Sequence, residues 1–496
     1  MLLLGIDLGT SSIKVAVVDA ASQACLASVQ YPDAETPVTV RKPGWAEQAP
    51  AAWWDHVCQA ILRAHATGTY NPRDIGAIGI AYQMHGLVLV DRDQQVLRDA
   101  IIWCDSRAVE IGERAFRAIG PEKCLSHLLN SPGNFTAAKL AWVREHEPSV
   151  YSRTSRVLLP GDFLAMKLTG EMTTSISALS EGIFWDFRAN RISRELLNYF
   201  GFDESLIPPV RPVFSEHGRL AAPVAAALSL APGIPVTYKA GDQPNNALSL
   251  GVLEPGQVAA TAGTSGVVYA VSDQLTSDPR SRINSFAHVN HSEEATRLGV
   301  LLCINGTGIL NRWMRDLLAP GESYDAINRQ AAGRPPGARG LRILPFGNGA
   351  ERMLENRLAG ASVLHADFNQ HTRGDLLRAA QEGIAFAFRY GLDILRENGM
   401  HPRLIRAGKA NLFLSPLFRE VFTQVTGCQL ELYNTDGAVG AARGAGLGIG
   451  YYRQFHEAFA GMEKLLEESP REALQREYEP VYQSWLEDLH HQLARS

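Results

Sequence analysis

A short motif that occurs twice, about half a chain apart, most constrains how this sequence can fold. Each copy has a run of small or apolar residues, a Gly-Thr-Ser turn and a second apolar run that ends in an aspartate. This pattern predicts a β-hairpin with a polar tip. The matched turn positions are Gly9 with Gly263, Thr10 with Thr264, and Ser11 with Ser265. Because internal repetition is strong evidence of architecture, we expect two related domains.

The turn of each hairpin has the composition of an anion-binding loop. Successive backbone N–H groups converge in such a turn, and small side chains let a phosphate approach the main chain. In the first copy, the hydroxyls of Thr10 and Ser11 and the ammonium of Lys14 would add to this grip. Asp7 would repel a phosphate unless a cation lay between them, which predicts Mg²⁺. The second copy has Thr261 at that position, and the alternative for each copy is an ordinary hairpin.

The overall composition excludes several classes of protein. The chain has 496 residues, of which 46% are hydrophobic and 20% charged, and its net charge is −5. These values are typical of a globular protein of roughly two to four domains, and they leave no basic surface for nucleic acid. No apolar segment reaches membrane-spanning length, and the six cysteines are scattered without a Cys-x-x-Cys pair. We therefore expect a cytoplasmic protein with no nucleic-acid or membrane partner.

Predicted strands and helices alternate along most of the chain, which indicates an α/β fold. We place the boundary between the two large domains near residue 245, which gives domains at 1–245 and 246–496. Residues 344–352 are expected to form a loop. Residues 453–496 are polar and are expected to form amphipathic helices.

Polar and aromatic side chains stand at or just beyond the ends of several predicted strands. They are Met84 and His85, Trp103, and Asp242. Open α/β sheets bind ligands beyond the carboxyl ends of their strands, so these side chains could line an acceptor pocket. Phosphoryl transfer needs a group that takes the acceptor's proton, and Asp242 is the best candidate for that base. The alternatives are a turn or cap aspartate at position 242 and ordinary core or turn residues at the other three positions.

Taken together, these motifs resemble the FGGY family of carbohydrate kinases, which belongs to the actin-like ATPase folds. The resemblance covers about residues 2–450, and within the family it is greatest to the kinases of D-xylulose. The segments that carry it are Gly5–Ser11, Gly263–Gly266, Gly44–Gln48, Gln83–Gly86 and Ala100–Asp105. It implies two ribonuclease-H-like domains flanking a central cleft. It also implies transfer of the γ-phosphate of ATP to the terminal hydroxyl of a ketopentose, with D-xylulose the first expectation.

The resemblance also implies roles for individual residues. Asp242 would be the base, Asp7 and Asp242 would hold Mg²⁺, and the sugar would be bound by Met84, His85, Trp103, Asp242 and Gln243. ATP would be bound by the two hairpins, by Lys14, and by Gly306, Gly408 and Asn411. The sequence departs from the family at Gln243, where asparagine is usual, and at Arg406 and Ala407, where a glycine-rich adenosine motif is usual.

Three questions stay open from the sequence. The acceptor could instead be ribulose, gluconate, fuculose or glycerol, since one sequence does not resolve the shape of a sugar pocket. A protein of another class, a non-catalytic actin-like nucleotide switch, would share both hairpins. Whether the chain forms a homodimer is also undecided.

Overall fold

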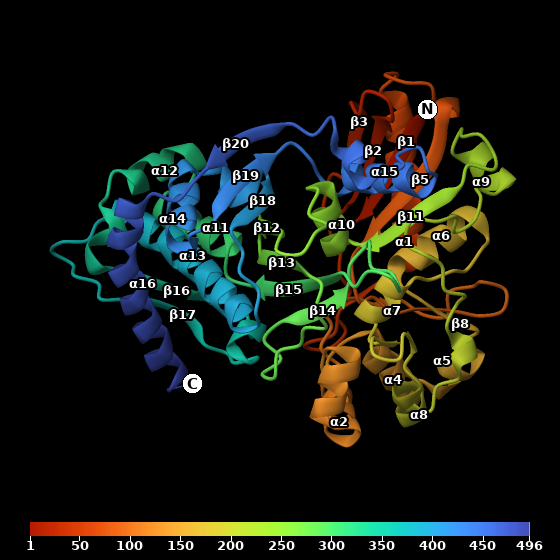
Figure 1. Cartoon of the computed structure of the whole chain (residues 1–496), viewed down its shortest axis with the longest axis horizontal. Helices are drawn as coiled ribbons and strands as arrows, with labels where there is room; N and C mark the ends of the chain where they lie inside the picture. The colour runs from red at the N-terminus through yellow and green to blue at the C-terminus, as the bar shows by residue number, and fades with distance from the viewer. Residues whose placement is uncertain (496) are drawn as a thin grey trace.

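Two β-sheets, one in each lobe, organise the structure, a computed structural model that describes residues 1–495 (Figure 1). The first sheet has the strand order β11-β5-β1-β2-β3, and the second has the order β14-β15-β13-β12-β18-β19-β20. The strands of the first sheet are β1 (Leu2–Leu8), β2 (Ile13–Asp19), β3 (Cys25–Tyr31), β5 (Ile75–Tyr82) and β11 (Val236–Gly241). Those of the second are β12 (Val258–Ala262), β13 (Gly266–Ser272), β14 (Asn284–Ala287), β15 (Leu298–Ile304), β18 (Leu404–Gly408), β19 (Gln429–Tyr433) and β20 (Lys464–Glu468).

Five strands of the second sheet repeat the first sheet in order and direction, with β14 and β20 added at the two edges, which confirms the duplication predicted from the hairpin motif. In the first sheet β2 pairs antiparallel with β1 and β3, while β5 and β11 continue parallel on the other side of β1. In the second sheet β13 pairs antiparallel with β12 and β15, while β18 and β19 continue parallel on the other side of β12. The hairpins β1–β2 and β12–β13 therefore occupy equivalent places in two copies of one fold.

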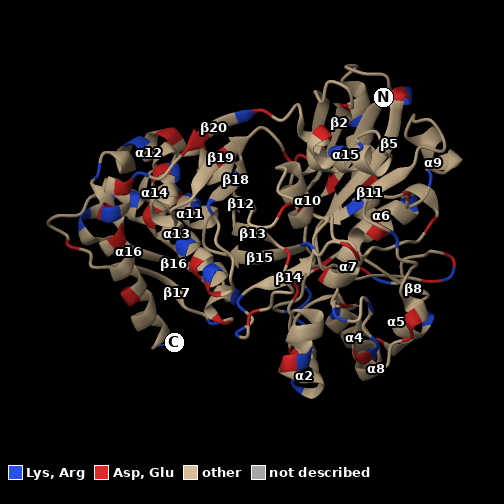
Figure 2. Cartoon of the chain, in the orientation of Figure 1, with Lys and Arg blue, Asp and Glu red and all other residues tan. Residues whose placement is uncertain are grey.

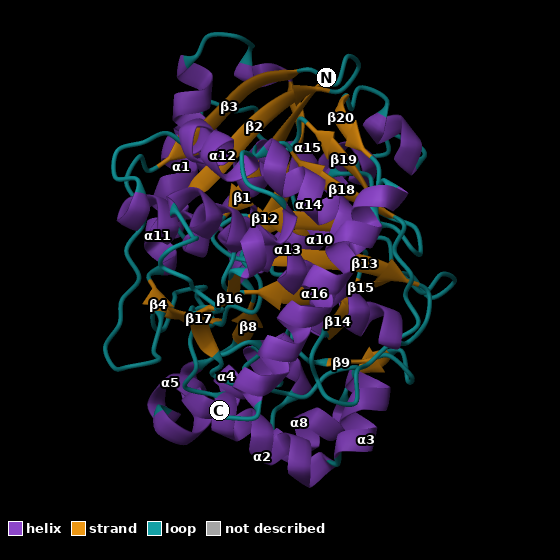
Figure 3. Ribbon diagram, turned by 90° about the vertical axis from the view of Figure 1, so that its left-hand side faces the viewer, coloured by secondary structure: helices purple, strands orange, loops and turns teal. Residues whose placement is uncertain are grey.

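Helices cover both sheets, and Figure 3 shows several helices of the second lobe in front of its strands. The principal helices of the first lobe are α1 (Pro50–Ala66), α2 (Val109–Ile119), α4 (Thr136–His146), α6 (Pro160–Thr169), α7 (Ile176–Glu181) and α8 (Arg194–Phe200). Those of the second are α11 (Gly308–Leu318), α12 (Tyr324–Ala332), α13 (Arg373–Glu397), α14 (Pro416–Thr426) and α16 (Glu472–Leu493). The longest, α13, begins with a capping box between Thr372 and Asp375, which satisfies backbone groups at its first turn.

Two further helices connect the lobes. α10 (Asp242–Ser249) leaves the last strand of the first sheet, and α15 (Gly437–Gly448) follows β19 of the second sheet. α15 packs on the first sheet, and in Figure 1 it lies in blue against the red strands of the N-terminal lobe. The approach is so close that a Cβ on Gly5 would lie 1.9 Å from the backbone oxygen of Ala438. Glycine at that position is therefore required by the packing.

Two local expectations are wrong. Residues 344–346 do not lie in a loop but belong to the strand β16 (Arg342–Phe346), which pairs with β17 (Gly360–Leu364). Residues 453–496 are not all helical, because β20 extends the second sheet beside β19. Residue 245 falls within α10, and the domain boundary placed there stays a prediction.

Surface charge and membrane-spanning potential can be judged from the described residues. Segments coloured for Lys and Arg and segments coloured for Asp and Glu are interspersed over both lobes in Figure 2. Within residues 1–495, no helix combines the length and the apolar character needed to cross a membrane.

Candidate active site

The carboxyl ends of three neighbouring parallel strands bring the main candidate residues to one edge of the first sheet. β1 pairs with β5 and β5 with β11, so Asp7, the loop after β5 and Asp242 lie at the same edge. Side-chain contacts agree with this placement. A Cβ on Gly241, the residue before Asp242, would lie 2.6 Å from Cγ of Met84. The structure therefore brings together the two predicted carboxylates and one predicted sugar contact.

The two carboxylates have strongly raised pKa values. Burial and the charge of Asp7 raise the pKa of Asp242 to about 7. Burial and the charge of Asp436 raise the pKa of Asp7 to about 6, against a smaller lowering by Lys14. Lys14 is the cross-strand neighbour of Asp7 in the first hairpin. Like charges held in a poorly solvated place are costly, so the site favours an added cation.

Mg²⁺ fits the donors that this edge offers. Mg²⁺ prefers carboxylate oxygens, retains several waters and is usually completed by substrate phosphates rather than by a closed protein cage. Asp7 and Asp242 supply two carboxylates, and among residues 1–495 no group of three or more His, Cys, Asp and Glu side chains forms a self-sufficient metal site. The set thus suits a metal shared with a phosphate.

Asp436 is a further carboxylate at this place that the sequence reasoning missed. It caps the first turn of α15, where its Oδ1 accepts a hydrogen bond from the backbone N–H of Val439 at 3.0 Å. The next residue, Gly437, packs against Asp7, because a Cβ there would lie 2.1 Å from Asp7 Oδ2. The Asp-Gly pair before an Ala/Gly-rich helix was the available signal, since it is a common helix start.

His85 is held as a neutral hydrogen-bond acceptor. Its Nδ1–H donates to the backbone oxygen of Glu181 at 2.9 Å, and its ring packs against Phe135 and Phe286. Burial and the nearby Lys139 lower the pKa of His85 to about 3, so the ring is uncharged at neutral pH. Because Nδ1 carries the proton, Nε2 has a free lone pair that can accept a hydrogen bond from a hydroxyl.

Trp103 links the predicted sugar side to the first phosphate hairpin. Its indole is 51% exposed, yet its Nε1–H donates to Oγ1 of Thr10 at 2.9 Å. The Thr10 hydroxyl in turn donates to Oε1 of Gln83 at 3.2 Å, and Gln48 donates to the Thr10 backbone oxygen at 2.8 Å. An exposed aromatic face on an anchored indole is a suitable wall for a sugar.

Gln243 lies beside the candidate base and has one unused acceptor. Its side-chain amide donates to the Asp242 carboxylate, and its own Oε1 is buried with no hydrogen-bond partner among the described residues 1–495. A buried unpaired amide oxygen is costly and calls for a ligand hydroxyl or a water. The substitution of the family's usual asparagine therefore keeps an amide that can serve both the base and a ligand.

The first hairpin is closed by a tight turn. The Gly9 N–H donates to the backbone oxygen of Ser12 at 3.1 Å, and Ser11 is exposed at the tip. The exposed tip leaves Ser11 free to meet a ligand, as the anion-binding prediction requires.

The second hairpin is braced by the start of α11. The backbone oxygens of Gly263 and Thr264 accept hydrogen bonds from the Thr307 hydroxyl at 2.9 and 3.1 Å. Ser265 completes this turn next to them. A Cβ on Gly263 would lie 3.4 Å from Nδ2 of Asn411, which places Asn411 beside this hairpin.

The remaining ATP-side glycines differ in what the structure requires of them. A Cβ on Gly306 would lie 1.6 Å from the backbone oxygen of Pro345, so this glycine is required by packing alone. A Cβ on Gly408 would meet only the Thr435 oxygen at an ordinary 3.5 Å. Arg406 pairs with Glu431 at 3.1 Å and also donates to the loop after α10, which makes it a structural residue.

Two buried charged residues of this region were also missed. Lys139 lies on α4 and donates a hydrogen bond to the backbone oxygen of His85. Glu181 is the last residue of α7, and its side chain packs against Gly241. Burial and the charge of Asp242 raise the pKa of Glu181 well above its usual value. A single charge inside an apolar stretch was the available signal for both, since such residues are rarely buried without a purpose.

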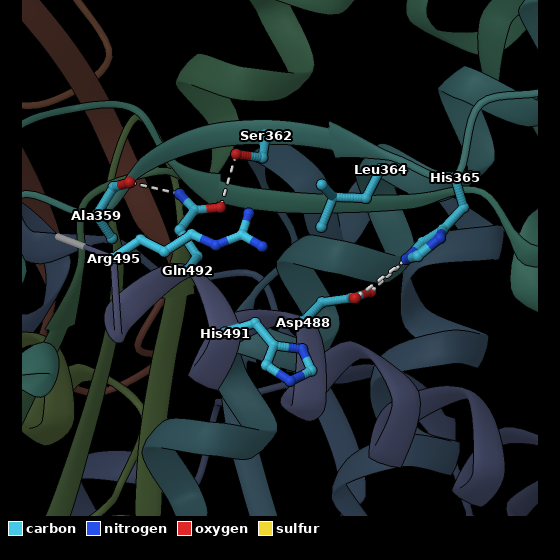
Figure 4. Close-up of a pocket in the computed structure, with 8 residues that line it drawn as sticks. All are labelled: Ala359, Ser362, Leu364, His365, Asp488, His491, Gln492 and Arg495. Carbon is cyan, nitrogen blue, oxygen red and sulfur yellow. Dashed lines mark hydrogen bonds and ion pairs between the residues drawn. The ribbon is translucent and has the colours of Figure 1, made fainter.

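A pocket of about 560 Å³ lies elsewhere, between β17 and α16 (Figure 4). It is lined by polar side chains that include His365, Asp488, His491 and Arg495, and His365 pairs with Asp488 at 3.0 Å. None of the candidate site residues lines it. The candidate active site stays at the carboxyl ends of β1, β5 and β11, as the sequence predicts.

Comparisons with known proteins identify the family of the chain. The N-terminal domain of the FGGY family of carbohydrate kinases matches residues 2–249, and its C-terminal domain matches residues 258–449. Xylulose kinase of Bacillus subtilis is 30% identical over 92% of this chain and 89% of its own, and xylulose kinase of Klebsiella pneumoniae is 31% identical over 89% and 88%.

Solved structures give the same result. Xylulose kinase from Rhodospirillum rubrum superposes with a TM-score of 0.89 at 27% identity over 100% of both chains. Gluconate kinase from Lactobacillus acidophilus shares the fold with a TM-score of 0.90 at 20% identity over 99% of this chain and 98% of its own. The chain belongs to the FGGY family of carbohydrate kinases, and it is a sugar kinase that uses ATP.

Proposed function

We propose that the protein transfers the γ-phosphate of ATP to the terminal hydroxyl of a ketopentose, and that this ketopentose is D-xylulose. The observation that carries the proposal is the setting of Asp242, a carboxylate whose pKa is raised to about 7 by burial and by the charge of Asp7, directly after Gly241, which packs against Met84. Its relatives at about 30% identity over most of the chain are named xylulose kinases, which supports the choice of sugar.

The acceptor side would be bound by the groups that follow β5, β7 (Ala100–Ile101) and β11. His85 Nε2 would accept a hydrogen bond from one sugar hydroxyl, and the free Oε1 of Gln243 would accept another. The indole face of Trp103 and the side chain of Met84 would enclose the carbon skeleton. Asp242 would accept the proton of the attacking hydroxyl, for which a pKa near neutral is well matched.

The phosphate side would be bound by the two hairpins. Backbone N–H groups and hydroxyls at Thr10, Ser11, Thr264 and Ser265 would hold the phosphates, as the duplicated turns predict. Mg²⁺, when bound at Asp7 and Asp242, would neutralise charge on the transferred group. Asn411 beside the second hairpin and Gly408 at the end of β18 remain predicted ATP contacts.

A coupled assay of ADP release tests the proposal. The purified protein is given ATP and Mg²⁺ with D-xylulose, ribulose, gluconate, fuculose or glycerol in turn, because the shared fold of a gluconate kinase shows that the fold does not decide the sugar. We expect the highest kcat/KM with D-xylulose. A clear preference for another sugar would refute the choice of acceptor, and slow ATP hydrolysis that no sugar accelerates would favour a nucleotide switch.

Two further expectations from the sequence remain predictions. A cytoplasmic location can be tested by fractionation of cells that express the chain. Light scattering on the purified protein would decide between a monomer and a homodimer.

A further inference from the structure

Lys139 is a lysine whose charged group is wholly inside the protein. It lies on α4, its side chain is 0% exposed, and its Nζ donates hydrogen bonds to two backbone oxygens. One is the oxygen of His85 at 2.9 Å, and the other is the oxygen of Ile102 at 3.0 Å. These two residues lie in separate loops, one after β5 and one after β7.

Among residues 1–495, no carboxylate forms an ion pair with this ammonium. The ionisable groups that face it are Asp105, Cys104, Arg107 and Glu181, and Asp105 is already engaged by Arg107 at 2.7 Å. Burial lowers the pKa of Lys139 to about 7, which shows how unfavourable the charge is at this place. A buried charge is retained only where its hydrogen bonds compensate for lost hydration. Here those bonds go to the main chain of two loops.

Both loops carry predicted sugar contacts whose geometry needs support. His85 has φ of 61°, a left-handed conformation that is unfavourable for a residue with a side chain. Ile102 directly precedes Trp103, whose indole is hydrogen-bonded to Thr10 of the first hairpin. The Lys139 side chain thus binds the main chain of both loops that carry the predicted sugar contacts.

We propose that Lys139 is a positioning residue for the acceptor: it holds the His85 and Trp103 loops in one relative arrangement and thereby sets the affinity for the sugar. It does not touch the reacting atoms. The inference rests on the proposed function in that it takes the groups after β5 and β7 to be the sugar side of the site.

The test compares steady-state kinetics of Lys139→Met with those of the unaltered enzyme, using whichever sugar the unaltered enzyme phosphorylates best. Loss of both charge-assisted hydrogen bonds is expected to raise the KM for the sugar roughly tenfold to a hundredfold. The KM for ATP should rise less than the KM for the sugar, because these loops reach the phosphate side at the Trp103–Thr10 hydrogen bond, while the second hairpin is braced separately by Thr307. An unchanged KM for the sugar, or equal increases for sugar and ATP, would overturn the proposal.

Leu140→Ala is the matched control. Leu140 is the next residue of α4 and is also buried, but it makes no hydrogen bond to either loop. It should lower the melting temperature through the cavity it creates while leaving the ratio of the two KM values unchanged. A rise in the sugar KM of this control equal to that of Lys139→Met would show that any loosening of α4 has the same effect.

A double-mutant cycle asks whether Lys139 acts through His85. In a His85→Ala background, the effect of Lys139→Met on the sugar KM should shrink markedly, because the group that it positions is already gone. If the effects of the two substitutions on the sugar KM are fully additive, Lys139 does not act through His85. If Lys139→Met does not fold, Lys139→Gln is measured instead. Its amide is one bond shorter than the lysine side chain and uncharged, so it would not keep both hydrogen bonds and the sugar KM should rise; a normal KM in that variant would refute the proposal. Failure of the proposed function would be seen separately, as absence of sugar-dependent turnover in the unaltered enzyme.

Discussion

Replacing Asp242 by asparagine should make the protein more stable and nearly inactive. The substitution keeps the shape of the side chain and removes its charge. In the folded protein, burial and the charge of Asp7 raise the pKa of Asp242 from its usual 3.8 to about 7. A change of that size corresponds to at most about 4 kcal/mol of destabilisation when the group is ionised. Asp242 keeps some contact with solvent, which reduces this cost. We therefore expect Asp242→Asn to raise the free energy of unfolding by about 1–3 kcal/mol at pH 8 without Mg²⁺.

The sign of the pH dependence follows from the direction of the shift. Below about pH 4 the carboxyl is protonated in both folded and unfolded protein, so the two proteins should be equally stable with respect to this group. Between about pH 4 and pH 7 only the unfolded chain ionises, and the unaltered protein loses stability relative to Asp242→Asn. Above pH 7 both states are ionised and the difference is constant.

Urea unfolding of both proteins at several pH values, with kcat measured in parallel, checks this reasoning. We expect kcat of Asp242→Asn to fall by roughly 10²–10⁴-fold, the usual contribution of a general base. In the unaltered enzyme, kcat should decline at acid pH because the base takes up a proton, with a midpoint below the metal-free pKa of about 7, since bound Mg²⁺ stabilises the ionised carboxylate. A less stable Asp242→Asn protein at pH 8 would refute the electrostatic argument, and a near-normal kcat would refute the assignment of the base.

Three other substitutions test separate parts of the structure. Asp7→Asn should lower the rate and raise the Mg²⁺ concentration needed for half-maximal activity; a Mg²⁺ titration at saturating ATP measures this, and an unchanged curve would argue against a metal role. Gly437→Ala puts a Cβ 2.1 Å from Asp7 Oδ2, so activity should fall by roughly a hundredfold through displacement of that carboxylate. Circular dichroism should show a retained fold, and normal activity would show that the contact is unimportant. Trp485→Ala removes a fully buried ring whose Nε1 donates to the Ile343 oxygen at 2.9 Å, and chemical denaturation should show a loss of about 3–5 kcal/mol. Its kcat should stay near normal, and a selective loss of kcat would contradict a purely structural role.

The duplicated hairpin was the part of the fold that the sequence predicted best. Hairpins depend on local pattern and turn chemistry, and both copies display these within about 15 residues. Asp7, Met84 and Asp242 each lie at or just after the end of a predicted strand. They come together because neighbouring parallel strands end on the same side of a sheet. The roles of these residues in binding and catalysis remain predictions that the substitutions above address.

The elements that were predicted wrongly owe their structure to distant partners. Residues 464–468 contain leucine and glutamate, which favour a helix, but they form β20 because the edge of β19 offers hydrogen bonds. Residues 344–346 likewise form a strand through pairing with β17. Such pairings are decided by tertiary context, which a single sequence does not display.

The supporting residues of the site could not be placed for the same reason. Lys139 reaches His85 across 54 residues, and the Glu181 oxygen reaches the His85 ring across 96. The unusual charge of Lys139 inside an apolar helix was visible in the sequence, but its partners were not. The Arg406 substitution in the glycine-rich motif is explained by the structure, which ties this side chain to Glu431 and to the loop after α10.

The close crossing of α10 and α15 predicts that the two lobes can close on substrates without disturbing the site that they share. The helices meet so closely that a Cβ on Gly440 would lie 2.6 Å from Cβ of Ser249, and Asn245 donates to the Gly437 oxygen at 2.9 Å. Asp242 begins one of these helices and Asp436 caps the other. Since these helices connect the lobes, a closing rotation is expected to pivot near their crossing. Atoms near a pivot move least, so the carboxylates would keep their arrangement while the more distant loops close over the substrates.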